Sequence, residues 1–506
     1  MFKDEEDKVE LPAIQQLQSL GWEYVHGSAL SPESSTERQY YKDVVLTERL
    51  NAAVKRINPW INESNLRNIT REFTHPKAAT MMEANQSVWK LLISYQSVLQ
   101  DIGKGNRSHT VKVIDFENPE NNEFLCTNQF KLEGLKQKVI PDILLFVNGL
   151  PLAVIECKSP YITNPMEAGI NQLLRYANRR QPHEDEGAER LFWYNQMMVS
   201  THRDKARVGT ISSRMEHYLE WKDPYPLTLD QVVTLQAPDA ANDPEVNELK
   251  NLAESEPQYS GKANSQEVLI AGLFNKANFL DMIQNFTVFE PVDGKVIKKI
   301  ARYQQFRAVH KTIDRIKTGK TQKDRGGVIW HTQGSGKSLT MVFLAIKMRR
   351  DTELQEYKLV FLTDRTQLDS QLTTTFRDAQ DETVYRANSV ASLKVLLRKD
   401  SSDLVTSTVQ KFQEGEDDFD FKELNASDKI IVLADEAHRT QYGTLGVAIS
   451  TALPNASKIA FTGTPLIKTE KTANAFGSYI DTYTIEQAVS DGATVQILYE
   501  GREAQT

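Results

Sequence analysis

Cysteine is almost absent from this chain, which has Cys126 and Cys157 and no others in 506 residues. Two cysteines cannot form the disulfide framework of a small secreted protein. Long apolar runs are also missing, because the longest, DILLFVNGLPLAVIE, is interrupted by Asn148-Gly149 and a proline and is too short to cross a bilayer. The acidic start MFKDEEDKVE lacks the basic and apolar regions of a signal peptide. We therefore expect a protein of the reducing cytoplasm that has no membrane partner.

A large excess of one charge is missing as well. The 60 Lys and Arg residues oppose 68 Asp and Glu residues, giving a net charge of −8. This balance excludes a polycation that coats DNA, so any contact with nucleic acid must be local. One local imbalance lies between Lys295 and Arg325, where eleven basic residues face only Asp314 and Asp324. A solvated helix face would explain that segment equally well.

The composition that remains is typical of folded proteins, with 40% hydrophobic and 25% charged residues. At about 100–200 residues per domain, this length predicts roughly three to four parts. Residues 1–110 have mostly helical periodicity, and strand-like segments begin near residue 111. The expected parts are an N-terminal module at 1–222, a linker or insertion at 223–265, a second module at 266–480 and the start of a further segment at 481–506.

The predicted fold class is α/β in both modules. In the first, strand-like segments and an Asn-Gly turn are followed by a helix over 166–181, which indicates a mixed sheet with flanking helices. In the second, five short apolar strands alternate with helical or polar stretches, as in a parallel sheet wound with helices. These strands are GGVIW, KLVFLT, DLVTST, KIIVLAD and KIAFTG.

A pattern typical of PD-(D/E)xK nucleases lies in the first module. Pro141-Asp142 is followed after thirteen residues by Glu156-Cys157-Lys158. Residues two apart on a strand share a face, so Glu156 and Lys158 would meet Asp142 from the preceding strand. Asp142 and Glu156 would bind Mg²⁺, and Lys158 would position the hydrolytic water. Glu-x-Lys is common on surface strands, but LAVIECK is too apolar for one, and buried charges require a partner or a metal.

Two further positions accompany this pattern. Gln172 and Tyr176 lie one helical turn apart on the same face and resemble the QxxxY motif beside the catalytic strand of RecB-type nucleases. Glu37 is a candidate for a further acid, although a glutamate at a helix N-terminus more often has a capping role.

A phosphate-binding loop is predicted in the second module, between the strand GGVIW and an apolar helix. Gly334 and Gly336 would let backbone N–H groups approach phosphate oxygens, Lys337 would contact the β and γ phosphates of ATP, and Ser338 would bind Mg²⁺. His331 occupies the position where the strict pattern has glycine. The expected nucleotide-binding residues of this loop are Gln333, Gly334, Ser335, Gly336, Lys337 and Ser338.

An acidic pair closes the apolar strand KIIVLAD, 98 residues after Lys337. It resembles a Walker B box, in which Asp435 would hold Mg²⁺ through water and Glu436 would activate the attacking water. Upstream, RYQQFRAV resembles a Q-motif, where Gln304, or Gln305 as second choice, would read the adenine edge. An ordinary amphipathic helix is the alternative for that segment.

The order of these motifs resembles the R (restriction and translocation) subunit of type I restriction-modification enzymes over nearly the whole chain. The resemblance rests on VIPDILLFVNGLPLAVIECKSP, QLLRY, RYQQFRAV, IWHTQGSGKSLTM, DEAHRTQYG and FTGTP. It implies a PD-(D/E)xK nuclease domain followed by a RecA-like lobe of superfamily 2. It further implies ATP-driven translocation of double-stranded DNA and cleavage away from the recognised site, in a complex with methyltransferase (M) and specificity (S) subunits.

Members of that family continue into a second RecA-like lobe, so a chain that stops at Thr506 is expected to be an N-terminal fragment. Three alternatives stay open. A type III restriction subunit is disfavoured because its nuclease follows the motor. A plain superfamily 2 helicase with a structural N-terminal domain is disfavoured only by the PD…ECK and QLLRY motifs. An N-terminal domain that binds DNA without cutting it is the third.

Overall fold

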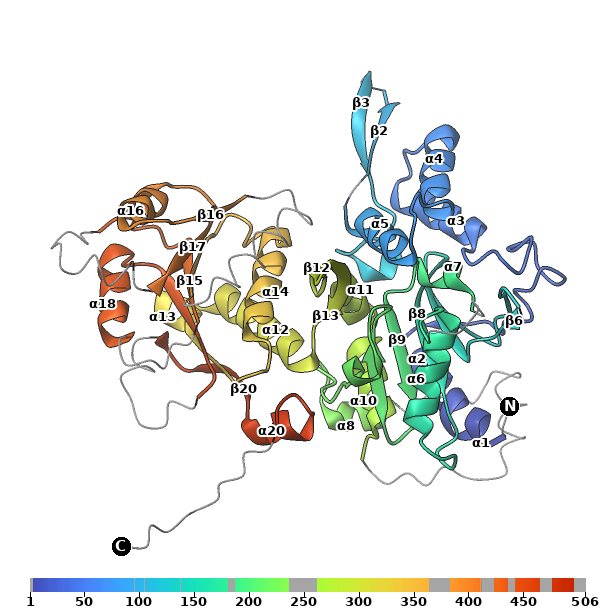
Figure 1. Cartoon of the computed structure of the whole chain (residues 1–506). Coiled ribbons are helices and arrows are strands. Elements are labelled where there is room, and N and C mark those ends of the chain that lie inside the picture. The colour runs from blue at the N-terminus through green and yellow to red at the C-terminus, as the bar shows by residue number, and fades with distance from the viewer. Residues whose placement is uncertain are drawn as a thin grey trace, which may run out of the picture. The chain divides into compact units, whose positions relative to one another are not determined.

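The computed structural model describes residues 3–94, 96–103, 105–136, 138–180, 187–235, 262–363, 383–409, 411, 423–435, 442–464 and 476–495. The chain forms two compact units, Met1–Ile300 and Ala301–Thr506 (Figure 1). Within the described ranges, no helix combines the length and apolar character that crossing a membrane would require.

A mixed seven-stranded sheet forms the centre of the first unit, in the order β1-β4-β7-β8-β9-β10-β11. The strands are β1 (Glu23–Tyr24), β4 (Phe124–Asn128), β7 (Ile143–Val147), β8 (Leu150–Cys157), β9 (Met197–Thr201), β10 (Ala206–Gly209) and β11 (Leu219–Glu220). Every residue of β7 and β8 is buried. They form the predicted hairpin, in which Asn148 and Gly149 both have positive φ, as a tight turn between antiparallel strands requires.

Helices accompany this sheet, and α6 is the crossover between the parallel strands β8 and β9. The main helices of the unit are α2 (Leu11–Ser19), α3 (Thr47–Ile57), α4 (Glu63–Thr74), α5 (Met81–Ile93), α6 (Pro165–Tyr176), α10 (Ser265–Leu273) and α11 (Lys276–Asn285), and shorter ones are α1 (Lys3–Glu5), the π-helical turn η1 (Glu6–Glu10), η2 (Pro119–Asn121), α7 (Glu189–Phe192), η3 (Met215–His217) and α8 (Leu229–Thr234). Three two-stranded ribbons complete it: β2–β3 (Gln96–Asp101, Asn106–Val111), β5–β6 (Leu132–Glu133, Lys138–Val139) and β12–β13 (Thr287–Val292, Lys295–Ile300).

Two features of this unit differ from the sequence-based expectation. The ribbon β2–β3 replaces the end of the expected helical region, and the exposure of successive residues alternates along β2, as in a half-exposed strand. The boundary between units lies at 300/301 rather than at 266, since the residue that follows α10 and a residue of α11 accept hydrogen bonds from tryptophans of the N-terminal part. Buried Trp22 donates to Phe274 O at 2.9 Å, and Trp89 donates to Ile283 O at 2.8 Å.

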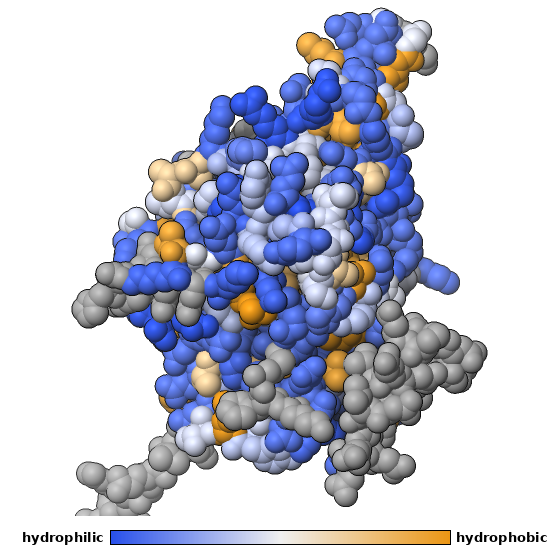
Figure 2. Space-filling view, turned by 90° about the vertical axis from the view of Figure 1, so that its right-hand side faces the viewer, coloured by the Kyte–Doolittle hydropathy of each residue, from blue (hydrophilic) through white to orange (hydrophobic). Residues whose placement is uncertain are grey.

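The surface of the first unit in Figure 2 is mostly hydrophilic, with apolar residues in small, separate patches. Leu99 and Ile102, near the tip of β2–β3, belong to the exposed apolar residues. Scattered apolar residues of this kind are normal on a folded domain.

A seven-stranded sheet in which every pair is parallel forms the second unit, in the order β16-β17-β15-β18-β19-β14-β20. Its strands are β14 (Gly327–His331), β15 (Lys358–Thr363), β16 (Val384–Arg386), β17 (Leu404–Thr408), β18 (Ile430–Ala434), β19 (Ser457–Thr462) and β20 (Tyr479–Tyr483), and its helices are α12 (Tyr303–Thr318), α13 (Gln322–Arg325), α14 (Lys337–Arg350), α16 (Val390–Arg398), α18 (Tyr442–Ala452) and α20 (Ile485–Ser490). The five predicted strands and their parallel arrangement are confirmed. The structure adds β16 and β20 at the two edges.

Candidate active sites

The first candidate site lies at one end of β7 and β8. Asp142 immediately precedes β7, Glu156 is the next-to-last residue of β8, and Lys158 follows that strand. The Lys158 Nζ atom donates to Glu156 Oε1 at 2.6 Å and lies 3.7 Å from Asp142 Oδ2. Asp142 Oδ2 also accepts from the backbone N–H of Cys157 at 2.7 Å. The structure therefore brings Asp142, Glu156 and Lys158 together, and we call them the acidic cluster.

All three side chains of the acidic cluster are buried. Burial raises the pKa of Asp142 to about 6, an effect that Lys158 partly offsets. Burial and the charge of Asp142 raise the pKa of Glu156 well above its usual range. Burial opposes protonation of Lys158, but Glu156 and Asp142 raise its pKa overall. The cluster has more negative than positive groups, so a further cation would favour the ionised carboxylates.

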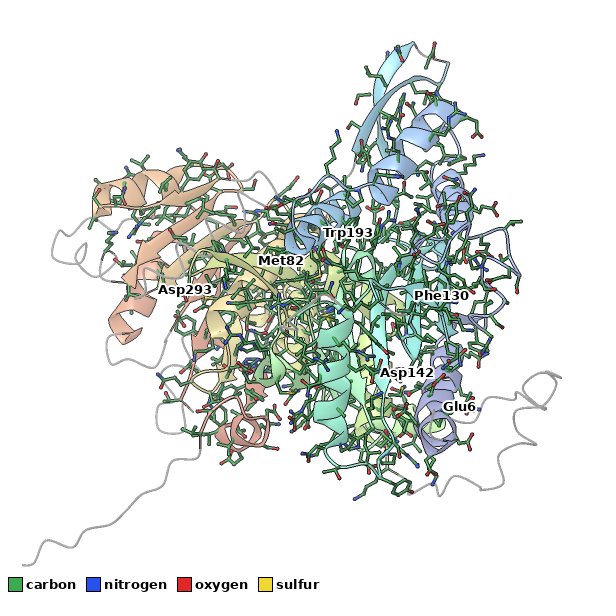
Figure 3. The ribbon with its side chains drawn as sticks, turned by 45° about the vertical axis from the view of Figure 1, so that its right-hand side comes forward. Glu6, Met82, Phe130, Asp142, Trp193 and Asp293 are labelled. Atoms are coloured by element: carbon green, nitrogen blue, oxygen red, sulfur yellow. The ribbon has the colours of Figure 1, made fainter. Side chains whose placement is uncertain are left out.

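The N-terminal segment adds two acids that the sequence patterns did not indicate. Glu5 Oε2 accepts from the backbone N–H of Ser159 at 3.2 Å, and Glu5 Oε1 lies 3.9 Å from Lys158 Nζ. Glu10 is fully buried and accepts from Asn128 at 2.7 Å. Burial, reinforced by Asp142, raises the pKa of Glu10 to about 8. Figure 3 shows Asp142 close above the helix that carries Glu6.

These two acids were missed because MFKDEEDKVE reads as a charged, solvated segment. The available signal was Val9-Glu10 directly before the apolar helix α2, where a glutamate at an inward position needs a partner.

The predicted pair on α6 lies beside the acidic cluster. Gln172 donates to the Tyr176 hydroxyl, which in turn donates to Ile140 O at 3.1 Å, two residues before Asp142. Tyr176 is buried, so the pair faces inward. Gly169 lies one turn earlier, where a Cβ would be 2.2 Å from Ser200 Oγ and 3.4 Å from Lys158 Cγ. A glycine at this position lets α6 approach the end of β8 closely.

Glu37 is not part of this arrangement. It lies outside any helix and accepts from Arg49 Nε at 2.7 Å, in an ion-pair group that also includes Glu123. The capping role considered for Glu37 is therefore wrong, because α3 begins at Thr47.

The second candidate site is the loop between β14 and α14. Gly334 and Gly336 have φ of +83° and +88°, which side chains disfavour, and Lys337 begins the helix. Lys337 Nζ donates to His331 O at 3.3 Å. A Cβ on Gly463, just after β19, would be 3.2 Å from that Nζ, so the segment FTG contacts the loop. Ser335 is buried, Ser338 is half-buried in the first turn of α14, and Gln333 is exposed.

The two candidate glutamines of α12 differ in their contacts. Gln305 accepts from Arg302 N at 2.8 Å and donates to Gly336 O at 3.0 Å, so it connects the helix cap to the phosphate-binding loop. Gln304 is 1% exposed, and neither atom of its amide has a hydrogen-bond partner among the described residues. The glutamine that touches the loop is therefore Gln305, the second choice from the sequence.

Asp435 follows β18, is buried, and its backbone N–H donates to Leu362 O at 2.9 Å. In the sheet, β19 separates β18 from β14, so Asp435 and the phosphate-binding loop leave the same edge of the sheet two strands apart. Glu436 lies outside the described residues.

His331 anchors the start of the loop through a charged group that the sequence did not indicate. Its Nε2 is 2.8 Å from Asp481 Oδ2 on β20, and Arg307 on α12 donates to both oxygens of Asp481, at 2.8 and 2.9 Å. Burial lowers the pKa of His331, so the ring is neutral near pH 7. Because an ionised carboxylate only accepts, we assign the proton to Nε2.

Comparison with known proteins agrees with this two-part architecture. Residues 2–217 match the family described as Type I restriction enzyme R protein N terminus, and residues 304–506 match the SWI2/SNF2 ATPase family. The type I restriction enzyme HindI endonuclease subunit of Haemophilus influenzae is 36% identical over 98% of this chain and 46% of that protein. The MjaIXP endonuclease subunit from Methanocaldococcus jannaschii is 35% identical over 99% of this chain and 46% of that protein.

A third relative, the SsaAORF53P endonuclease subunit of Staphylococcus saprophyticus, is 26% identical over 73% of this chain and 35% of that protein. The chain thus spans about half the length of the curated relatives it matches. Since residues 2–217 match the R protein N terminus and the similarity to the two endonuclease subunits extends over nearly the whole chain, the chain belongs to the endonuclease (R) subunits of type I restriction enzymes.

Proposed function

We propose that this chain provides the nuclease and the ATP-binding part of the motor in a type I restriction-modification complex with M and S subunits. In that complex the double-stranded DNA would be translocated by ATP hydrolysis and cleaved away from the recognition site. The observation that supports cleavage most directly is the acidic cluster, in which two carboxylates and a lysine converge in a buried position at the end of β7 and β8.

The donor set of the acidic cluster suits Mg²⁺. Glu156 Oε2 is buried and has no hydrogen-bond partner among the described residues, so an acceptor is left for a cation. In the described part of the chain, no three His, Cys, Asp or Glu side chains are placed to hold a metal by themselves. Asp142 and Glu156 would therefore hold Mg²⁺ together with oxygens from outside these side chains. The bound ion would lower the pKa of a water and stabilise the charge that develops on the phosphate.

The chain's own residues have separate roles in this proposal. Lys158, kept protonated by Glu156 and Asp142, would hold the negative charge of the phosphodiester next to the carboxylates. The hydrogen bonds from Gln172 to Tyr176 and from Tyr176 to Ile140 O would fix the backbone just before Asp142. These two residues therefore act by positioning Asp142.

For the motor, the phosphate-binding loop supports use of ATP with Mg²⁺. Gly334 and Gly336 leave the backbone N–H groups accessible, and Lys337 is held at the first turn of α14 beside Gly463. Lys337 would transfer from His331 O to the phosphates when nucleotide binds. Ser338 and Asp435 would hold Mg²⁺, Gln305 would couple adenine recognition to the loop, and Glu436 would activate water.

The deciding experiment compares Lys158→Ala with Lys205→Ala in the complex reconstituted with M and S subunits. Lys205 is exposed and serves as a control that removes the same charge. We expect Lys158→Ala to abolish Mg²⁺-dependent cleavage of double-stranded DNA while ATP hydrolysis and translocation stay near normal. Cleavage that survives Lys158→Ala would contradict the nuclease assignment and favour a helicase with a structural N-terminal domain.

A further inference from the structure

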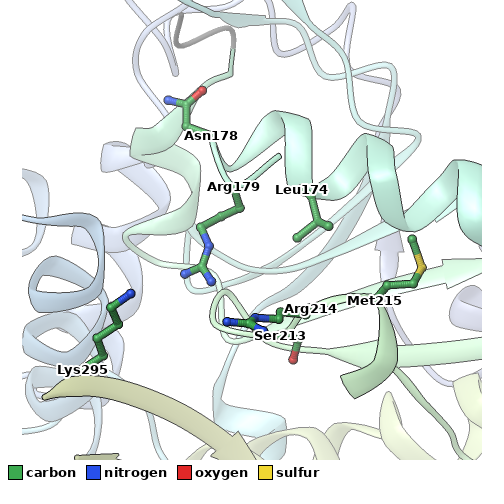
Figure 4. Close-up of a pocket in the computed structure, with 7 residues that line it drawn as sticks. All are labelled: Leu174, Asn178, Arg179, Ser213, Arg214, Met215 and Lys295. Carbon is green, nitrogen blue, oxygen red and sulfur yellow. The ribbon is translucent and has the colours of Figure 1, made fainter. Parts of the chain in front are cut away.

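A cavity of about 400 Å³ opens in the first unit, beyond the residues assigned above. Its lining is Leu174, Asn178, Arg179, Ser213, Arg214, Met215 and Lys295 (Figure 4). Figure 4 shows the side chains of Arg179, Arg214 and Lys295 extending toward the same space from three different segments. We call this cavity the basic pocket.

The charges of the basic pocket are not neutralised within the described chain. No described acidic side chain forms an ion pair with Arg179, Arg214 or Lys295, and the lining contains no carboxylate. Arg179 is half-buried, and burial together with the charge of Arg214 lowers its pKa. Placing like charges close together is unfavourable, and an anionic ligand would lower that cost.

The frame of the basic pocket is fixed by hydrogen bonds. Arg179 Nη2 donates to Ser212 O at 3.4 Å. The Ser212 hydroxyl donates to Lys298 O at 2.8 Å and accepts from Lys298 N at 3.0 Å, which ties the loop before Arg214 to β13. Ser213 Oγ accepts from Thr210 N at 2.9 Å. These hydrogen bonds hold the Arg179 guanidinium and the loop before Arg214 in place, which reduces the entropic cost of binding at that side of the pocket.

The position of the pocket on α6 indicates the size of the ligand. Leu174 lines the pocket, whereas Gln172 and Tyr176 of the same helix lie beside the acidic cluster. Residues two apart on a helix point about 200° away from each other, so the pocket and the cluster lie on different flanks of α6. An anion that contacts both the basic pocket and the acidic cluster must therefore be extended. Leu174 and Met215 give the pocket an apolar wall, against which a sugar could pack.

We infer that the basic pocket is a second DNA contact of this unit, binding the phosphodiester backbone away from the phosphate that is cut. The guanidinium groups of Arg179 and Arg214 suit paired hydrogen bonds to phosphate oxygens, and Lys295 adds a third positive charge. This inference rests on the proposed nuclease function and adds the surface that would hold the DNA there. Contacts of this type position the nucleic acid without reading its sequence.

The test measures binding of a labelled DNA duplex to the 506-residue chain by fluorescence anisotropy, in EDTA so that no cleavage occurs. The variant is Arg179→Gln/Arg214→Gln, and Lys205→Gln is the control that removes charge from an exposed position. We expect the double variant to bind roughly tenfold more weakly or worse. The slope of log affinity against log salt should become shallower by about 0.9 for each DNA phosphate that the variant no longer neutralises.

Arg214→Lys keeps the charge and should retain most of the affinity, and thermal melting checks that every variant folds. Equal affinity and equal salt slope for the double variant and the unchanged chain would overturn the inference, as would an unchanged chain that does not bind duplex. Inorganic phosphate that displaces DNA far better than chloride at equal ionic strength, in the unchanged chain only, would indicate a small-anion site instead. The nuclease proposal is tested separately by cleavage in the reconstituted complex, so its failure can be told apart from a failure of this inference.

Discussion

Replacing Asp481 by Asn should destabilise the second unit strongly. Asp481 is 3% exposed and is the shared partner of Arg307 and His331. Asn has nearly the same volume but no charge, so the Arg307 guanidinium, whose side chain is 14% exposed, would lose its ion pair with Asp481. Breaking a buried pair costs about 3–5 kcal/mol. Lys311 also contacts Asp481 at 2.9 Å, but its side chain is 41% exposed, so its share is small.

Because Asn keeps one acceptor oxygen, we expect the lower end, about 3 kcal/mol. For a unit of this size, about 1 kcal/mol lowers the melting temperature by roughly 2–4 °C, so the drop should be roughly 6–12 °C. Differential scanning calorimetry of the full chain measures it, with Asp428→Asn as control. The Asp428 side chain is 67% exposed and pairs with Arg325 at 3.5 Å, so removing its charge should change little.

The same contact predicts a pH dependence. Burial opposes ionisation of Asp481, but the hydrogen bonds from His331 and Arg307 lower its pKa well below 3.8. A carboxyl group whose pKa is lower in the folded than in the unfolded chain stabilises the fold at pH values above its unfolded pKa. This stabilisation decreases as the pH falls below the unfolded pKa towards the folded pKa. The unchanged chain should therefore lose its advantage over Asp481→Asn on acidification below about pH 4. A variant that melts within about 2 °C of the unchanged chain at pH 7 would refute this reasoning.

Three further predictions concern other contacts. Gly169→Ala should lower stability by about 1–3 kcal/mol in chemical denaturation and reduce DNA cleavage, because its Cβ would meet Ser200 Oγ, and adding Ser200→Ala should restore part of both. Burial lowers the pKa of Lys298, so the unfolded chain binds that proton more tightly than the folded chain does. The free energy of unfolding of the unchanged chain should therefore rise as the pH approaches 10.5, and Lys298→Met should lack this rise. The same pH dependence in both proteins would contradict this prediction. Lys337→Ala should abolish binding of Mg-ATP in isothermal titration calorimetry, while Lys205→Ala should not, and unchanged heats for Lys337→Ala would place the nucleotide elsewhere.

The sequence predicted the elements whose local pattern agrees with their tertiary role. The five predicted strands of the second unit are short apolar runs, as expected for strands that a parallel sheet buries on both faces. The turn at Asn148-Gly149 could be predicted because these two residue types readily adopt the positive φ that it requires. The convergence of Asp142 with Glu156 and Lys158 followed from strand periodicity, because a hairpin places the two ends side by side.

The parts that escaped prediction depend on distant partners. Glu10 lies near the acidic cluster because η1 packs against β8, and the sequence around Glu10 indicates a need for a partner without saying which residue more than 100 positions away provides it. The sequences of α10 and α11 do not indicate which unit these helices belong to. Their attachment to the first unit follows from the hydrogen bonds that Trp22 and Trp89 donate to Phe274 O and Ile283 O. The choice between Gln304 and Gln305 required the position of Gly336 O, which depends on the fold of the loop.

The strand β14 is bonded on both sides, to β19 and to β20, along nearly its whole length. Both neighbours run parallel to β14, so sliding β14 along them would require several backbone hydrogen bonds to break together. The support of the phosphate-binding loop is thus mechanically stiff. The positions whose backbone can rotate most easily are Gly334 and Gly336, which follow β14 and have no side chains to restrict φ and ψ. A force produced at the nucleotide would therefore deform the loop before it displaced the strand, and the sheet would act as the fixed frame against which attached segments move.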